Sequence, residues 1–173
     1  YNIAFKYFSV STMIFTLILT PYWSSFTEAF VKKEFNWIKM SVKNIIKIWL
    51  FVPVLLFVMI LLSDWFYSIW VGNKIIIPIS LSISMALFVL LSTFNSVFVF
   101  FINGTGKIKI QLLLSLFTAA LNIPLSIYLA KNLNLGIKGV ILATVICTLP
   151  AMILMPLQYY KIVNNKATGI WEK

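Results

Sequence analysis

A run of polar and aromatic side chains lies at the end of an apolar stretch that covers residues 8–31. The run consists of Pro21, Tyr22, Trp23, Ser24, Ser25, Thr27 and Glu28. In a helix that faced lipid alone, such polar groups would lack hydrogen-bond partners, which costs free energy. The run therefore predicts a helix that faces protein or a water-filled cavity. One interpretation is a translocation path, with Tyr22, Trp23, Ser25, Thr27 and Glu28 as candidate substrate contacts. The other is that small polar residues only let helices pack closely.

Glu28 is the one carboxylate in this run, and it has two interpretations. A carboxylate beside a transport path could couple transport to a proton or sodium gradient. However, Glu28 precedes Lys32 by four residues, which is the favourable order for an ion pair on a helix. The sequence leaves both interpretations open.

A regular series of lysines follows the first apolar stretch. Lys39, Lys43 and Lys47 recur every four residues, while Ile38 and Val42 lie on the other side of the same helical turn. This spacing predicts an amphipathic helix over residues 34–48 that lies at the membrane interface and leads into the next span. The three lysines are candidate contacts for phosphate-bearing headgroups. The alternative is the general retention of lysines on the cytoplasmic side.

The residue types exclude most bond-breaking chemistry. The chain has no histidine, only four acidic residues, which are scattered, and a single cysteine, Cys147, in an apolar run. General acid–base catalysis or a metal site would need such groups in clusters. We therefore expect no enzyme, no catalytic residue, no metal and no cofactor. The net charge of +10 comes from lysines between apolar runs, so the expected partners are lipid headgroups and not nucleic acid.

The elements that position these residues are membrane spans. The chain is 61% hydrophobic and only 10% charged, more apolar than a soluble domain needs. We predict an all-α bundle, a single transmembrane domain over residues 1–173, with five spans near residues 8–31, 45–65, 79–102, 110–130 and 139–160. Residues 64–78 are predicted to form a loop with an aromatic belt and a turn at Gly72–Asn73. In the third span, Ser92, Thr93, Asn95 and Ser96 are expected to pack on protein.

The lysines also predict an orientation. Alternating spans put ten lysines on one side, namely Lys32, Lys33, Lys39, Lys43, Lys47, Lys107, Lys109, Lys161, Lys166 and Lys173. The other side has four, namely Lys6, Lys74, Lys131 and Lys138. The positive-inside rule then predicts a cytoplasmic C-terminus. With five spans, Tyr1 starts outside, from which we expect that a further N-terminal part of the protein precedes this chain.

Several segments resemble a known family over nearly the whole chain. They are YNIAFKYFS, LTPYWSSFTEAFVKKEFNWIK, LSDWFYSIWVG, FFINGTGKIKIQ and LNIPLSIYLA. These segments resemble bacterial polysaccharide flippases, the O-antigen and capsule repeat-unit translocases of the multidrug/oligosaccharidyl-lipid/polysaccharide exporter superfamily. None of the segments is a catalytic signature.

The resemblance implies a function and partners. The chain would be the last five helices of a twelve-helix, two-lobed transporter in the bacterial cytoplasmic membrane. By alternating access it would flip undecaprenyl-diphosphate-linked oligosaccharides, with the missing N-terminal lobe as its partner and a polysaccharide polymerase as a further candidate. Tyr22, Trp23, Ser25 and Thr27 would then contact sugar rings. A multidrug or organic-cation exporter of the same superfamily and a non-transporting membrane protein are the alternatives.

Overall fold

The computed structural model describes residues 1–72 and 77–172, and these residues form helices and no strand. The elements are α1 (Asn2–Val31), α2 (Phe35–Trp49), α3 (Phe51–Val71), α4 (Ile79–Thr105), α5 (Lys109–Ile127), the π-helical turn η1 (Tyr128–Asn132), α6 (Ile137–Val163) and the 3-10 turn η2 (Gly169–Glu172). Within residues 1–72 and 77–172, five helical segments are long and apolar enough to cross a membrane. The chain is therefore a multi-pass, all-α membrane protein with five spans, as the sequence predicted.

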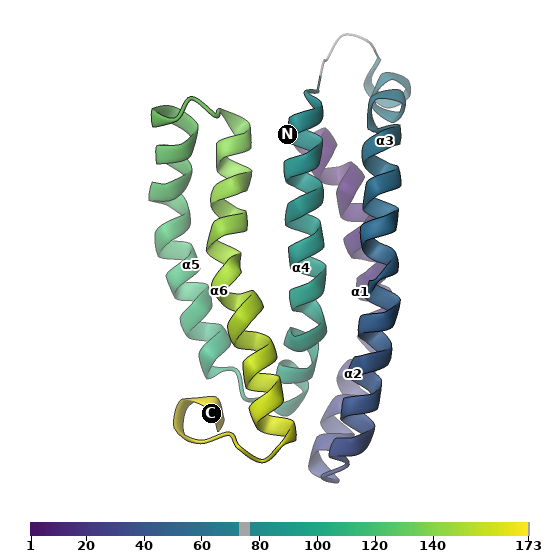
Figure 1. Cartoon of the computed structure of the whole chain (residues 1–173), viewed down its shortest axis with the longest axis vertical. Coiled ribbons are helices and arrows are strands. Elements are labelled where there is room, and N and C mark those ends of the chain that lie inside the picture. The colour runs from purple at the N-terminus through teal and green to yellow at the C-terminus, as the bar shows by residue number, and fades with distance from the viewer. Residues whose placement is uncertain (73–76, 173) are drawn as a thin grey trace.

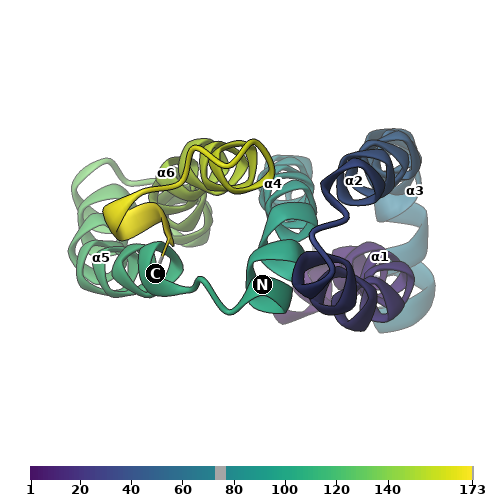
Figure 2. The same cartoon turned by 90° about the horizontal axis from the view of Figure 1, so that it is seen from below.

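The five spans run alternately up and down the long axis of the molecule (Figure 1). α4 is central, because it packs against α1 and α3 on one side and against α6 on the other. α5 packs mainly against α6, so the α5–α6 pair forms one flank of the molecule (Figure 2). This arrangement leaves α4 and α5 apart, with α6 joining them.

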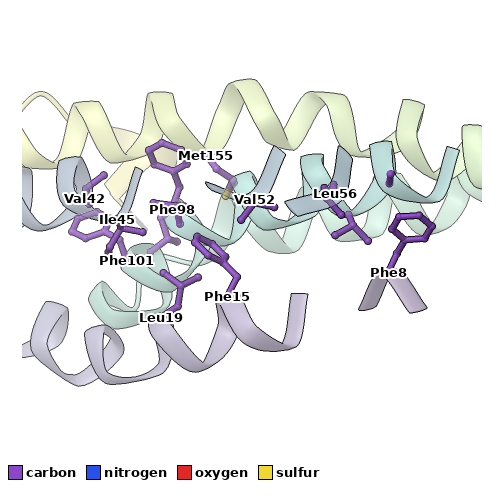
Figure 3. Close-up of a cluster of buried hydrophobic side chains, with 14 of the residues drawn as sticks. Phe8, Phe15, Leu19, Val42, Ile45, Val52, Leu56, Phe98, Phe101 and Met155 are labelled. Carbon is purple, nitrogen blue, oxygen red and sulfur yellow. The ribbon is translucent and has the colours of Figure 1, made fainter. Parts of the chain in front are cut away.

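The core lies where α1, α2, α3 and α6 meet α4. Its buried side chains include Phe15 and Leu19 of α1, Ile45 of α2, Phe101 of α4 and Met155 of α6 (Figure 3). Gly104 lets α1 and α4 approach closely, since a Cβ atom there would lie 3.1 Å from the Trp23 carbonyl oxygen. Side chains of α1, α2 and α6 thus fix the position of α4 within the bundle.

α2 covers all but the first of the residues over which the sequence predicted an amphipathic helix, 34–48. It is amphipathic, runs along the bundle and continues into α3 with only Leu50 between them (Figures 1 and 2). Ile38, Val42 and Ile45 are buried, and the helix packs on α1, α3, α4 and α6. Because its apolar face is covered by protein, α2 does not need a lipid surface to bury it.

The prediction of a loop over residues 64–78 is wrong for residues 64–71, which are helical. α3 continues to Val71, so the aromatic residues at its end are helical. Tyr67 is buried and its hydroxyl lies 3.1 Å from the Ser82 Oγ of α4, while the ring of Phe66 packs 4.5 Å from that of Tyr7. These contacts stabilise the last helical turns of α3. Gly72 has a φ of +78° at the end of α3, whereas Asn73 of the predicted turn lies outside the described residues.

Candidate functional site

A groove of about 860 Å³ lies between α4, α5 and α6. It forms because α5 rests on α6 and makes few close contacts with α4 (Figure 2). The lining residues are Leu91, Ser92, Asn95, Ser96 and Val99 of α4, Gln111, Leu114, Ser115, Thr118, Ala119, Asn122 and Ile123 of α5, and Thr144, Thr148, Ala151 and Met155 of α6. The groove therefore runs along the membrane-spanning part of three helices.

The groove is uncharged and mixed in character, because polar side chains are numerous along it while most of its lining surface is apolar. More than half of its lining side chains carry a hydroxyl or carboxamide group, and none of those that the structure describes carries a charge. Groups of this kind inside membrane spans normally bond to a neighbouring helix or line a cavity. Here they line a cavity, and the volume falls in the range of small-molecule binding sites.

Some of these polar groups are satisfied within the bundle. The Asn122 Nδ2 donates to the Thr144 Oγ1 over 3.0 Å, which joins α5 to α6. The Thr118 hydroxyl donates to the Cys147 carbonyl oxygen over 3.1 Å. The Ser115 hydroxyl donates to the backbone of its own helix at Gln111. The first two bonds hold α5 against α6 along one wall of the groove.

Two carboxamide groups of the groove are not fully satisfied. The Asn95 Oδ1 and the Gln111 Oε1 are buried atoms without a hydrogen-bond partner among the described residues. Buried polar atoms in native proteins are nearly always paired, so each exception calls for an explanation. The two orphan oxygens lie on opposite walls of the same groove, Asn95 on α4 and Gln111 on α5.

The structure places the polar run of α1 elsewhere. Trp23, Thr27 and Glu28 are exposed and outline a shallow hollow of about 540 Å³ together with Ser24, Val31 and Lys32. Tyr22 and Ser25 are half-buried, and the Ser25 hydroxyl donates to the Pro21 carbonyl oxygen over 3.1 Å. None of the five α1 candidates lines the groove. The two polar surfaces of the chain are therefore separate.

The ion pair expected at Glu28 is present. Lys32 Nζ lies 2.6 Å from Glu28 Oε1, and both side chains are exposed. The hydrogen bond and the charge of Glu28 raise the pKa of Lys32. The lysine is therefore charged throughout the neutral range and remains available as a partner for Glu28.

Lys39, Lys43 and Lys47 share the exposed face of α2, as their spacing predicted. The structure adds a contact that the sequence did not indicate, because the Lys39 Nζ donates to the Asn164 Oδ1 over 2.8 Å. Asn164 follows directly on the end of α6. Lys39 thus ties α2 to the end of the last span.

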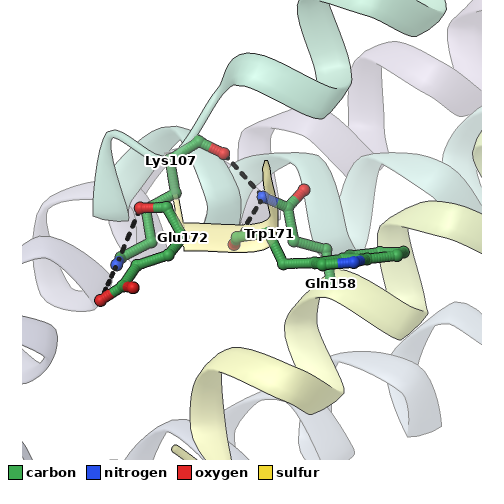
Figure 4. A network of polar contacts seen from close by, with 4 residues as sticks. All are labelled: Lys107, Gln158, Trp171 and Glu172. Carbon is green, nitrogen blue, oxygen red and sulfur yellow. Dashed lines mark hydrogen bonds and ion pairs between the residues drawn. The ribbon is translucent and has the colours of Figure 1, made fainter. Parts of the chain in front are cut away.

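The C-terminal tail folds back on the bundle (Figure 4). The Gln158 Nε2 donates to the carbonyl oxygens of Lys107, over 2.8 Å, and Trp171, over 3.4 Å. The Lys107 Nζ donates to the Glu172 carbonyl oxygen over 3.2 Å, and Lys161 lies 3.8 Å from the centre of the Trp171 ring. The tail therefore joins the α4–α5 turn to the end of α6, at the lower end of the groove.

Sequence reasoning named some groove residues but gave them another role. Ser92, Thr93, Asn95 and Ser96 were predicted to pack together on protein, but the structure divides them. Thr93 accepts a hydrogen bond from the Trp49 Nε1 over 3.1 Å, whereas the other three line the groove. A helix turns by 100° per residue, so Thr93 faces away from Asn95.

The polar residues of α5 and α6 were missed, although the sequence contains a signal for them. Gln111, Ser115, Thr118 and Asn122 recur at intervals of four, three and four residues, which places them on one face of a helix. Thr144 and Thr148 show the same spacing in α6. In an otherwise apolar span, such a polar stripe predicts a face that is turned away from lipid.

Comparisons of the chain with protein-family models, with curated proteins and with solved structures give no significant match. Within residues 1–72 and 77–172, no group of three His, Cys, Asp or Glu side chains could hold a metal ion.

Proposed function

We propose that this chain is part of a transporter that moves lipid-linked oligosaccharide repeat units across the bacterial cytoplasmic membrane. The observation that carries the proposal is the uncharged polar groove of about 860 Å³ along three membrane spans. A sugar presents many hydroxyl groups, each able to donate and accept hydrogen bonds. Crossing the hydrocarbon core without such partners would be prohibitively costly, and the groove supplies them at membrane depth.

The resemblance of segments such as PYWSSFTEA and INGTGKI to polysaccharide flippases supports the same proposal. On this proposal the substrate carries an undecaprenyl diphosphate, and the transporter works by alternating access together with an N-terminal lobe. A polysaccharide polymerase would receive the flipped units. No bond is made or broken, so the relevant free energies are those of binding in two conformations.

The test is performed on cells that lack the gene. An impermeant reagent that oxidises sugars labels repeat units in the outer leaflet only, and the total is measured after the cells are permeabilised. We expect normal synthesis, repeat units trapped in the inner leaflet, and recovery when the gene is restored. Normal labelling from outside in the deletion strain would contradict the proposal. It would favour an exporter of organic cations, for which drug sensitivity is the next measurement.

A further inference from the structure

We infer that the groove between α4, α5 and α6 is a binding site for neutral carbohydrate, and that the carboxamides of Asn95 and Gln111 are its main recognition groups. The inference rests on the proposed function, because a lipid-linked oligosaccharide is what would bring the carbohydrate to the groove. It adds the place of binding, the groups that bind, and the exclusion of charged sugars.

The first argument is the unmet hydrogen bonding of the two carboxamides. The buried oxygens of Asn95 and Gln111 have no partner among the described residues, yet both side chains line the groove. The terminal torsion of an amide side chain is broad and roughly two-fold, so a rotation exchanges oxygen and nitrogen at the groove surface. An acyl chain can satisfy neither atom. A sugar hydroxyl can pair with whichever of the two atoms faces the groove, because it donates and accepts.

The second argument is the shape of the polar surface. On α5, the stripe from Gln111 to Asn122 extends for about 16 Å at the rise of an α-helix. Small side chains, among them Ser115, Ala119 and Ala151, leave the space open. A long, open surface with a hydroxyl or carboxamide group at each turn of α5 suits a chain of sugar rings better than a compact solute.

The third argument is the absence of charge among the described lining residues. A carboxylate or diphosphate in such a groove would lose hydration without gaining a counter-charge, which is unfavourable. Lys107 lies near the lower end of the groove, but its Nζ is 3.9 Å from Glu172 and donates to the carbonyl oxygen of the same residue. The groove therefore favours neutral sugars, and the diphosphate must be held elsewhere.

Another transmembrane helix is the rival occupant, since small residues also allow close helix packing. A predominantly apolar helix would offer no hydrogen bond to the groove-facing ends of the Asn95 and Gln111 carboxamides, whereas carbohydrate would. We therefore commit to carbohydrate, and occupation by a helix is one outcome of the test.

The test measures whether sugars protect the groove from chemical labelling. Cys147 is replaced by serine, Ser115→Cys places a thiol in the groove, and the intact protein is embedded in lipid nanodiscs. A water-soluble maleimide labels the thiol in the presence of maltotriose, chitotriose, trigalacturonate or inorganic pyrophosphate. We expect at least one neutral trisaccharide to slow labelling and the two anions to have no effect. Equal protection by trigalacturonate, or no protection by either neutral sugar, would overturn the inference.

The recognition groups are tested by variants of similar size. Asn95→Leu and Gln111→Met remove a carboxamide that has an unpaired oxygen, so thermal stability should not fall. Each variant should weaken protection about fivefold. Ala119→Phe should fill the groove and abolish protection, while Ala120→Phe, at an exposed position outside the groove, should not. Unchanged protection in both carboxamide variants would contradict the assignment.

Two outcomes separate this inference from the proposed function. If the deletion strain traps repeat units inside but cells with Asn95→Leu and Gln111→Met export them normally, the groove assignment fails and the flippase proposal stands. If neutral sugars protect the groove but the deletion strain exports repeat units normally, the reverse holds. A thiol at position 115 that resists labelling without sugar and cross-links to another transmembrane segment would show that a helix occupies the groove.

Discussion

At the residue scale, polar side chains of the spans have two distinct uses. Thr93 and Asn95 are two positions apart in α4, yet the Thr93 Oγ1 accepts a hydrogen bond from Trp49 while the Asn95 Oδ1 has no described partner. The first contact joins the end of α2 to α4 and is fully protein-bound. The second belongs to the groove. A polar residue in a span is therefore structural or functional according to the helix face that carries it.

The Trp49–Thr93 contact gives a stability prediction. Thr93→Val keeps the shape of the side chain but removes the acceptor, and it leaves the indole N–H unpaired in a half-buried position. We expect a loss of about 1 kcal/mol, the scale of interhelical hydrogen bonds in membranes. Thr93→Ser retains the hydroxyl and should lose less. Unfolding of both variants in mixed micelles measures this, and equal losses would mean that the methyl group, not the hydrogen bond, is important.

The sequence predicts contacts of this scale only when they are local. The Glu28–Lys32 pair follows from the four-residue spacing, and it is present at 2.6 Å. The Lys39–Asn164 and Gln158–Trp171 contacts were not predicted. The first of these joins residues that are 125 positions apart, so it depends on how the helices pack. The polar stripe of α5 could have been recognised, because helical periodicity is a local property.

At the element scale, close approaches between segments depend on glycine. At Gly104 a Cβ atom would lie 3.1 Å from atoms of Trp23 and Phe26, and at Gly139 it would lie 2.7 Å from backbone atoms of Leu129 and Ala130. The first distance requires a small adjustment, whereas the second requires the backbone to move. The start of α6 therefore approaches the η1 backbone more closely at Gly139 than α4 approaches α1 at Gly104.

These two glycines provide a matched pair of variants. Alanine at either position gains about 1 kcal/mol of helix propensity, but overpacking costs about 1–3 kcal/mol. We expect Gly104→Ala to be nearly neutral, because its neighbours need to move by only a few tenths of an ångström. Gly139→Ala should be clearly destabilising. Thermal melting of both variants in the same detergent gives the order, and the reverse order would contradict the packing described for η1.

The lysines of α2 should act on lipids at the scale of one element. Lys43 and Lys47 are exposed on the face opposite to the buried Ile38 and Ile45. Charges next to a membrane attract anionic headgroups. Lys43→Gln together with Lys47→Gln should lower severalfold the phosphatidylglycerol that copurifies with the protein. Lys131→Gln with Lys138→Gln, at the opposite end of the bundle, is the control, and an equal loss in the control would refute a specific role of α2.

Whether an amphipathic segment lies on the membrane or within the bundle could not be predicted from its pattern. The amphipathic pattern over residues 34–48 requires that Ile38, Val42 and Ile45 be covered by an apolar surface. Either lipid or protein can provide that surface. The answer depends on α1, α3, α4 and α6, which surround α2. The spans themselves were predictable because long apolar stretches have one interpretation in a membrane. The end of α3 was missed because aromatic belts are common both in loops and at helix ends.

At the scale of the whole molecule, burial is unevenly distributed. α4 has many buried side chains, whereas among all the described residues of α5 only Ile110 is buried. The groove exists because of this difference, since α5 packs mainly against α6, with smaller contacts to η1 and η2, and remains apart from α4. No single segment of the sequence encodes such a feature. The spacing of polar residues predicts a polar face on each of α4, α5 and α6. That the three faces line one groove depends on how the helices pack.

The lysines give the last prediction, which concerns orientation. The start of α1, the η1 turn and the start of α6, which carry Lys6, Lys131 and Lys138, lie towards one end of the bundle (Figure 1). The segments that carry the other described lysines lie towards the opposite end, while Lys74 and Lys173 lie outside the described residues. The positive-inside rule assigns the lysine-rich end to the cytoplasm. With Cys147 replaced by serine, Lys131→Cys should react with an impermeant maleimide on intact cells. Lys43→Cys should react only after the cells are opened. Both side chains are exposed, so access depends on the membrane and not on burial. Labelling of Lys43→Cys on intact cells would reverse the orientation and place the lysine face of α2 outside the cell.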